Sequence, residues 1–435
     1  MKVDRILFCL GISICLICST YGQENGVNFV KGLTWSEIKV KASRENKYIF
    51  LDCFATWCGP CKLMDKNVYG NDSLSKLNDS FIFVKVQMDT SEKDNHDTQL
   101  WYNDASAIRE KYHVNSFPTF LIFSPRGDIV HADIGYKDVP DLLALCENAM
   151  NPDRQYYVLL NQYISGEKQY RSMQYLANTA DQLGNKELAY AIAKDYIDHD
   201  LIFLNDHSIF TTENIAFLSK FTLSSKDKGF QLFFKKGRII DSVINLPHYS
   251  NGFVDYIISK ENIYPEVSAA FKAGNKEPDW VSLTKNISEK YGKERADRNI
   301  IKAKIRWFGS AGNTIEYTKT CTAYLLKYSN EMDDVEINEQ AWAIFLYSKN
   351  EDELKTALGK MKEVIGSRPI NSSQIDAETD TYANLLYKLG LSGEAIAMEH
   401  KAIELGKAAG MGERKDFLEN LEKMKKGIPT WPDKN

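Results

Sequence analysis

The sequence predicts an α/β domain, with a mixed sheet flanked by helices, followed by an all-α domain of helical hairpins. Two observations predict this order. Short apolar runs alternate with helical patterns up to about residue 152, and beyond it strand patterns nearly vanish while apolar residues recur at helical spacing. A chain of 435 residues is also long for a single core. We therefore expect a signal peptide over 1–22, an α/β domain over 23–152 and a helical-repeat-like domain over 153–435.

The elements of the first domain follow one another with recognisable boundaries. Thr34 and Glu37 have the spacing of a capping box, which predicts a helix to about Asn46. The apolar run 48–54 predicts a strand, and Pro60 suits the first turn of the next helix because a proline needs no amide there. The later elements alternate in the same way: a strand over 81–88, a helix near 105–112, strands over 119–123 and 129–133 joined by turn residues 124–128, and a helix over 139–149. Helices interleaved with strands predict a sheet covered on both faces.

A Cys-x-x-Cys motif separates the strand over 48–54 from the helix that follows it. Cys58 and Cys61 can close a small disulfide, and the positive end of a helix favours the thiolate of Cys58, the attacking species in thiol–disulfide exchange. Half of a zinc site is the alternative. Zinc needs three or four ligands, and no second close Cys or Cys/His pair follows. The motif thus favours redox chemistry, with no metal and no cofactor.

Residues 48–62 resemble the active-site segment of thioredoxins, including Trp57 before the first cysteine and Lys62 after the second. Other residues of that family's pattern follow in order: Asp52, Lys85, Phe117-Pro118-Thr119 and Gly135. The resemblance covers about the first third of the chain. It implies a thioredoxin-like fold and catalysis of disulfide exchange by Cys58 and Cys61.

The resemblance makes Asp52 a buried carboxylate beneath the disulfide and Lys85 its companion on the neighbouring strand. The residues themselves agree, because Asp52 lies in an apolar run where burial should raise its pKa. A carboxylate of that kind is a plausible proton acceptor for Cys61. The alternative is an Asp52 satisfied only by hydrogen bonds or by Lys85. Cys53 points to the opposite face of the strand and is expected to be a small buried hydrophobe.

Substrate contacts are expected around the motif and the proline loop. A proline at the start of a strand is ordinary, and only the resemblance implies a cis bond before Pro118 that frees the preceding backbone to pair with a peptide. The expected substrate-binding residues are Trp57, Gly59, Pro60, Phe117, Pro118 and Thr119.

The first residues predict export. Lys2 and Arg5 precede the apolar run Ile6–Cys18, which is short for a membrane span, and small residues follow up to Gly22. We expect cleavage near Gly22 and a periplasmic or secreted protein; an uncleaved anchor is the rival interpretation. The last two cysteines of the run follow isoleucine, which argues against a lipoprotein signal. The cysteines beyond the signal do not form a disulfide framework.

Two segments depart from a plain thioredoxin. Leu63–Ser80 interrupts what would be one long helix, and in this respect the domain resembles the thioredoxin-like module of bacterial thiol:disulfide interchange proteins. Thr90–Asn103 is a polar insertion. A solvated loop is the favoured interpretation of the insertion, and a flap that selects substrates or partners is the alternative.

The helical region contains repeat-like hairpins. Asp376–Gly390 with Ser392–Leu405 resembles one tetratricopeptide hairpin. Similar pairs are 339–347 with 352–365, 300–306 with 315–328, and 174–184 with 187–197. Their period is irregular, and their aromatic residues are expected in the core. Stacked hairpins form a concave surface that suits an extended peptide or a partner helix.

These observations predict an exported bacterial thiol–disulfide oxidoreductase that reduces disulfides of substrate proteins. The Gly-Pro pair between the cysteines is that of thioredoxin, a strong reductant, which implies a membrane-embedded electron donor. A second class of function is a helical scaffold or binding protein with the redox module as an accessory; a disulfide isomerase or oxidase is a further alternative. The net charge of −5 gives no reason to expect nucleic acid as a partner.

Overall fold

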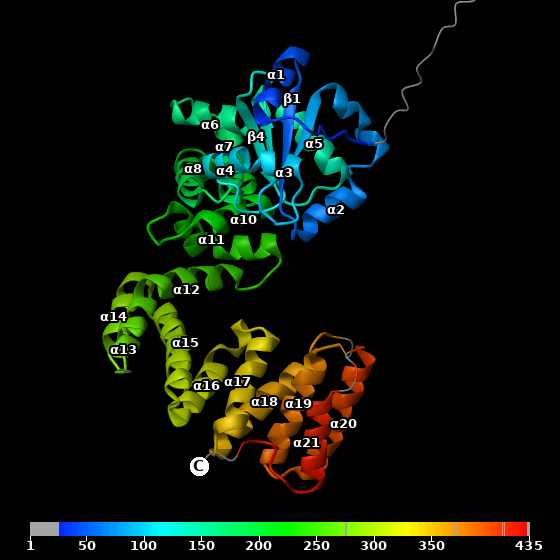
Figure 1. Ribbon diagram of the computed structural model, residues 1–435. Coiled ribbons are helices and arrows are strands. Elements are labelled where there is room, and N and C mark those ends of the chain that lie inside the picture. The colour runs from blue at the N-terminus through cyan, green and yellow to red at the C-terminus, as the bar shows by residue number, and fades with distance from the viewer. Residues whose placement is uncertain (1–25, 275, 370–371, 411, 413, 433–435) are drawn as a thin grey trace, which may run out of the picture. The chain divides into compact units, whose positions relative to one another are not determined.

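The computed structural model describes residues 26–274, 276–369, 372–410, 412 and 414–432. It divides into two compact units, Met1–Leu201 and Ile202–Asn435, which are treated separately below (Figure 1). The expected signal peptide over 1–22 lies outside the described residues. Within the described residues, none of the helices combines the length and the apolar character that crossing a bilayer requires.

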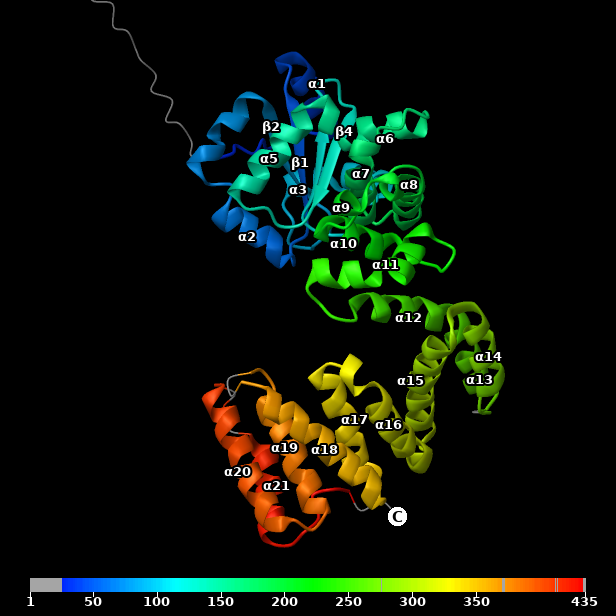
Figure 2. The ribbon, with the colours of Figure 1, turned by 180° about the vertical axis from the view of Figure 1, so that it is seen from behind.

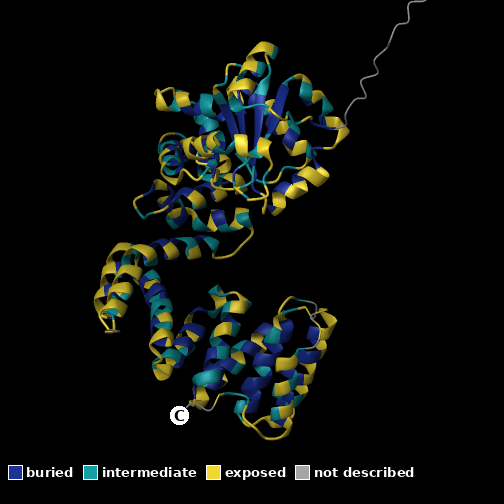
Figure 3. Ribbon diagram, in the orientation of Figure 1, coloured by how far each residue is buried: buried dark blue, intermediate teal, exposed yellow. Residues whose placement is uncertain are grey.

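A four-stranded mixed sheet forms the centre of the first unit. In the order β2-β1-β3-β4 it comprises β2 (Phe81–Gln87), β1 (Tyr48–Phe54), β3 (Thr119–Phe123) and β4 (Ile129–Ile134). β1 pairs with β2 in parallel, whereas the β1–β3 and β3–β4 pairs are antiparallel. The mixed sheet predicted from the sequence is confirmed, and Figure 3 shows its strands largely buried.

Helices cover both faces of this sheet. α2 (Gly59–Asn67) and α5 (Val139–Met150) pack on the face that carries Phe50 and Phe120. α1 (Trp35–Glu45) and α4 (Tyr102–Lys111) pack on the opposite face. Thr34 and Glu37 form the expected capping box of α1. The interruption after α2 folds as a 3-10 helix, η1 (Asp72–Asp79). Cys53 is buried on the face opposite Phe50, as predicted.

The polar insertion 90–103 is mostly exposed and contains hydrogen-bonded structure of its own. It contains α3 (His96–Leu100), and the Asp94 carboxylate accepts hydrogen bonds from Gln87 Nε2 at 2.8 Å, the Ser91 amide at 2.8 Å and the Tyr102 hydroxyl at 2.6 Å. The Trp101 indole donates to the Leu33 carbonyl at 3.0 Å. The expected solvated character is confirmed, since most of residues 90–103 are exposed, but the segment is not a plain loop: α3 and these contacts tie it to β2 and to the chain before α1.

Three helices beyond residue 152 belong to the first compact unit. They are α6 (Tyr156–Ile164), α7 (Tyr170–Gln182) and α8 (Lys186–His199). The Tyr156 amide donates to His131 Nδ1 on β4 at 3.2 Å, and the Gln155 side chain donates to the Ala149 carbonyl at 2.7 Å. Burial lowers the pKa of His131 to about 4, so its ring is a neutral acceptor at neutral pH. The expected boundary between the two domains after residue 152 stays a prediction.

In its described residues, the second unit consists of helices and the turns that join them (Figure 2). Its helices are α9 (Asp206–Ile209), α10 (Thr212–Phe221), α11 (Lys228–Ile244), α12 (Tyr249–Asn262), α13 (Tyr264–Lys272), α14 (Trp280–Tyr291), α15 (Lys293–Ala311), α16 (Thr314–Tyr328), α17 (Asp334–Tyr347), α18 (Glu351–Ser367), α19 (Ile375–Lys388), α20 (Ser392–Ala408) and α21 (Lys415–Lys425). The expected all-α region is confirmed. The hairpin expected over 376–405 corresponds to α19 and α20, and neighbouring helices share apolar cores.

Candidate functional site

Cys58 and Cys61 form a disulfide where β1 leads into α2. Their sulfur atoms are 2.06 Å apart and their Cα atoms 5.4 Å apart. Cys58 is the N-cap of α2, and its Sγ accepts the Cys61 amide hydrogen at 3.1 Å. Pro60 occupies the first turn, where its missing amide has no intrahelical partner to lose. The start of the helix thus surrounds the Cys58 sulfur with positive potential, which favours a thiolate there after reduction.

The two cysteines are equally buried in this oxidised form. Cys58 is 2% exposed and Cys61 is 3% exposed. The position of Cys58 on the loop side of the motif does not expose it, because Ala55, Phe54 and Phe117 pack around both residues. The distinction between the two sulfurs is therefore their position on α2 rather than their exposure.

The surface next to the disulfide is apolar and open. Trp57 is 70% exposed, and its ring lies edge-on to that of Phe117 with centroids 5.7 Å apart. Gly59 and Pro60 are also exposed. These residues form an exposed surface beside the disulfide to which a polypeptide can bind. Their role as substrate-binding residues stays a prediction.

The proline loop lies beside the motif. The Phe117–Pro118 peptide bond is cis, as the resemblance implied. The Pro118 carbonyl accepts the Gly135 amide hydrogen at 2.8 Å, and Gly135 has a φ of +89°, which favours glycine. Thr119 is buried opposite Cys53 on β1, and its hydroxyl donates to the Ser116 carbonyl at 2.7 Å. Strand pairing therefore fixes this loop against the end of β1.

Asp52 is a buried carboxylate on the face of β1 that α2 covers. Its Oδ2 accepts a hydrogen bond from the Tyr69 hydroxyl at 2.7 Å and lies 3.9 Å from Lys85 Nζ. Its Oδ1 is buried and has no hydrogen-bond partner among the described residues. Burial raises the pKa of Asp52 to about 6, although Lys85 and then Tyr69 act in the opposite direction. A carboxyl group of this kind can take up a proton near neutral pH.

Lys85 pairs with Asp52 in the β1–β2 register and contacts more than one group. Its Nζ forms an ion pair with Asp65 of α2 and lies 4.9 Å from the ring centroid of Phe54 and 5.4 Å from that of Tyr69. The alternative was that hydrogen bonds or Lys85 satisfy the whole Asp52 carboxylate. It holds for Oδ2 but not for Oδ1. Tyr69 and Asp65 were not identified from the sequence. A buried Asp52 needs a hydrogen-bond donor, and this need was the one indication that such a partner exists.

The segment after β2 reaches the cysteine motif. Asp89 lies two residues beyond the end of β2, and its carboxylate oxygens accept the Thr56 amide hydrogen at 3.0 and 3.1 Å. The Thr56 hydroxyl also donates to Asp89. Because Thr56 lies two residues before Cys58, the insertion begins next to the redox site.

In the described part of the chain, no group of three or more His, Cys, Asp or Glu side chains could hold a metal ion.

Comparison with known proteins matches this first domain. A family model described as a thioredoxin-like domain matches residues 36–150. A thioredoxin of Echinococcus granulosus is 32% identical over 90 residues, which are 21% of this chain and 68% of that protein. The M-type chloroplast thioredoxin of Brassica napus is 30% identical over 108 residues, which are 25% of this chain and 50% of that protein. The chain thus spans half to about two thirds of the length of these relatives.

Among solved structures, one match is a solution structure from Bacteroides thetaiotaomicron that is provisionally described as a disulphide-isomerase. It is 30% identical, and the alignment covers 29% of this chain and 95% of that chain, with a TM-score of 0.25.

Proposed function

Because the chain belongs to the thioredoxin family through residues 36–150, we propose that it is an exported thiol–disulfide oxidoreductase that reduces disulfides in substrate proteins. Its N-terminal domain is a thioredoxin-like disulfide oxidoreductase. The observation that carries the proposal is the Cys58–Cys61 disulfide at the start of α2. Cys58 attacks a substrate disulfide, and Cys61 releases the reduced substrate and closes the disulfide again.

Gly59 and Pro60 between the cysteines support the reducing direction. Thioredoxin has a potential of about −270 mV, whereas the isomerase range is near −180 mV. An exported reductant of this kind needs a supply of electrons from a membrane-embedded donor, because the periplasm is kept oxidising. The segment Ile6–Cys18 with Lys2 and Arg5 before it supports export.

Equilibration of the full-length protein with glutathione tests the direction of electron flow. We expect a potential near that of thioredoxin, about −270 mV, from the ratio of reduced to oxidised Cys58–Cys61 at equilibrium. The double variant Cys58→Ser/Cys61→Ser is the blank. A potential more oxidising than about −180 mV would overturn the reductase proposal in favour of an isomerase or oxidase.

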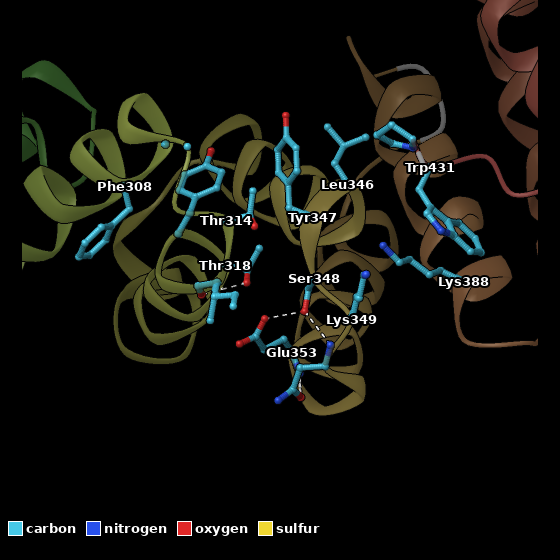
Figure 4. Close-up of a pocket in the computed structure, with 16 residues that line it drawn as sticks. Phe308, Thr314, Thr318, Leu346, Tyr347, Ser348, Lys349, Glu353, Lys388 and Trp431 are labelled. Atoms are coloured by element: carbon cyan, nitrogen blue, oxygen red, sulfur yellow. Dashed lines mark hydrogen bonds between the residues drawn. The ribbon is translucent and has the colours of Figure 1, made fainter. Parts of the chain in front are cut away.

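A second candidate, a partner-binding function of the helical region, is supported by a pocket in the second unit (Figure 4). The pocket has a volume of about 940 Å³ and is lined by residues of α15 to α19 and of the segment after α21. Its aromatic lining residues are Phe308, Tyr317, Tyr347 and Trp431. Aromatic walls with a few polar groups are typical of binding pockets.

Two lysines give this pocket a positive character. Lys349 and Lys388 both line it, and neither forms an ion pair with a carboxylate among the described residues. Lys388 donates to the Phe345 carbonyl and lies 5.0 Å from the Trp431 ring centroid. Burial, and then the charge of Lys349, lowers the pKa of Lys388 to about 8. Glu353, the carboxylate among the lining residues, already accepts the Ser348 hydroxyl at 2.6 Å. An acidic polypeptide segment with an apolar side chain fits this combination.

Replacement of both pocket lysines is expected to weaken the binding of acidic segments. In the full-length Lys349→Met/Lys388→Met variant, a fluorescent peptide with alternating Asp and Leu residues should bind about tenfold more weakly at low salt, since two charge contacts are lost. Lys401→Met, on the exposed side of α20, is the matched control and should bind within twofold of the parent protein. Equal binding of the acidic peptide and its Asn-for-Asp counterpart would contradict the proposal.

A further inference from the structure

The buried carboxylate of Asp52 has two oxygens in different environments. Oδ2 accepts the Tyr69 hydroxyl hydrogen at 2.7 Å and lies on the side of Lys85, whose Nζ is 3.9 Å away. Oδ1 is buried and has no hydrogen-bond partner among the described residues. A buried carboxylate oxygen without a donor costs free energy, and in a native structure a group of this kind is often explained by a catalytic or redox role.

We propose that Tyr69 and Asp65 are positioning residues of the exchange reaction, which together leave Oδ1 of Asp52 as the oxygen that receives the proton of Cys61. This inference rests on the proposed function. Tyr69 holds Oδ2 through its hydroxyl, and Asp65 draws the Lys85 ammonium into an ion pair with its own carboxylate. Neither residue belongs to the motif through which the chain resembles thioredoxins.

The packing around Tyr69 gives it a fixed orientation. Tyr69 follows α2 by two residues and is buried in the same core as Phe50 and Phe120, the neighbours of Asp52 on that face. Its ring lies edge-on to Phe29, with centroids 4.9 Å apart. The Val27 amide donates to the Tyr69 carbonyl at 2.9 Å. The hydroxyl therefore has a defined direction, and burial raises the Tyr69 pKa, so that the group stays a donor.

The other charged and titratable groups near Asp52 are few. β2 contributes Lys85, and α2 contributes Asp65 and the two cysteines. α5 contributes Cys146 on the Tyr69 side, where burial raises the pKa of its thiol to about 12, so that it is neutral. β3 places Phe120 opposite Asp52. The ionisation of Asp52 is thus governed by burial, Lys85, Tyr69 and Asp65, in that order.

The step in question starts from a mixed disulfide between Cys58 and a substrate cysteine. The Cys61 thiol gives its proton to Oδ1 of Asp52, and the resulting thiolate attacks Cys58 Sγ. The Cys58–Cys61 bond forms, the bond from Cys58 to the substrate sulfur breaks, and the substrate sulfur leaves as a thiolate. Two electrons pass from the cysteine pair to the substrate, and Asp52 then returns its proton to water or to the departing sulfur.

The pH dependence of this step separates positioning from a merely structural role. Reduced full-length protein is mixed with a model peptide disulfide and quenched in acid, so that formation and resolution of the mixed disulfide are measured separately. The resolution rate falls at acid pH as Asp52 becomes protonated, and this fall is its acid limb. In Tyr69→Phe the ionised Asp52 loses its donor, so the acid limb should shift to a pH about one unit higher. In Asp65→Asn, Lys85 loses its competing partner and a nearby negative charge is removed. Both changes favour the ionised Asp52, so the acid limb should shift to lower pH.

Tyr102→Phe is the matched control, because it removes a tyrosine–aspartate hydrogen bond of 2.6 Å at Asp94 in the same domain. Its acid limb should stay at the parent value. If the parent protein resolves its mixed disulfides but the acid limb is unchanged in both Tyr69→Phe and Asp65→Asn, this inference is overturned while the proposed function stands. A parent protein that forms no mixed disulfide would overturn the proposed function instead. If Tyr69→Phe fails to fold, the Asp65→Asn shift decides, since Asp65 is half exposed.

Discussion

Cys58→Ser is expected to abolish disulfide exchange, whereas Cys61→Ser is expected to trap substrate proteins on Cys58 as stable mixed disulfides. The Cys58 sulfur is the N-cap of α2 and accepts the Cys61 amide hydrogen, so its thiolate is the stabilised one. Without that thiolate no attack on a substrate begins. Without Cys61 the attack still occurs, but no internal thiol remains to break the new bond.

Non-reducing electrophoresis of each variant with an envelope extract, followed by mass spectrometry of the adducts, measures this separation. Cys321→Ser is the matched control: Cys321 is a free buried cysteine of the second unit, and burial raises the pKa of its thiol to about 12. It should behave as the parent protein does. Adducts on Cys61 in the Cys58→Ser variant, or none in Cys61→Ser with substrates present, would contradict the assignment.

Most of the first fold was predictable, because each of its elements has a local cause. The apolar runs over 48–54 and 119–123 form central strands, and Thr34 with Glu37 caps α1 as its spacing indicates. The redox pair was predictable for the same reason, since Cys58 and Cys61 lie at the boundary of a strand and a helix. Local patterns of this kind need no knowledge of the rest of the chain.

The features that escaped prediction depend on contacts between distant segments. Tyr69 lies in the turn after α2, and its position in the sequence did not identify it as the donor to Asp52, yet the fold brings its hydroxyl to that carboxylate. The burial of Cys58 depends in part on Phe117, which lies on another loop. The insertion was expected to be a loop because of its polar composition, but Asp94 uses those polar groups to bind its neighbours. Composition predicts solvent exposure, and it does not reveal which polar groups satisfy one another.

The helical region was predictable as a class but not in its boundaries. Helical spacing indicated α17 to α20. The packing of α6 on β4 depends on Tyr156 and His131, which are 25 residues apart. An aromatic residue at helical spacing does not say whether its helix packs on another helix or on a sheet. The sequence therefore could not predict that α6 to α8 join the first compact unit.

Asp52→Asn is expected to stabilise the oxidised protein above pH 6 and to slow resolution of the mixed disulfide. The pKa of Asp52 is raised to about 6 in the folded protein, mainly by burial, from an ordinary value of 3.8. The folded state therefore favours the protonated form, so the stability that Asp52 contributes is lost as the pH rises from about 4 through 6. Asparagine stays neutral, and the difference amounts to about 3 kcal/mol at pH 8 and vanishes below pH 4.

Urea denaturation at pH 4 and pH 8, monitored through the tryptophans of the first unit, measures this difference in the free energy of unfolding. Asp94→Asn is the matched control with the opposite sign: hydrogen bonds from Tyr102 and Gln87 lower the pKa of Asp94, so its contribution is present above the ordinary pKa and is lost as the pH falls. Asp94→Asn should therefore be destabilising at pH 8. An Asp52→Asn variant that is no more stable than the parent at pH 8 would show that burial does not disfavour the ionised Asp52 carboxylate as described above. A variant that is stabilised yet resolves mixed disulfides at the parent rate would show that another group takes the proton of Cys61.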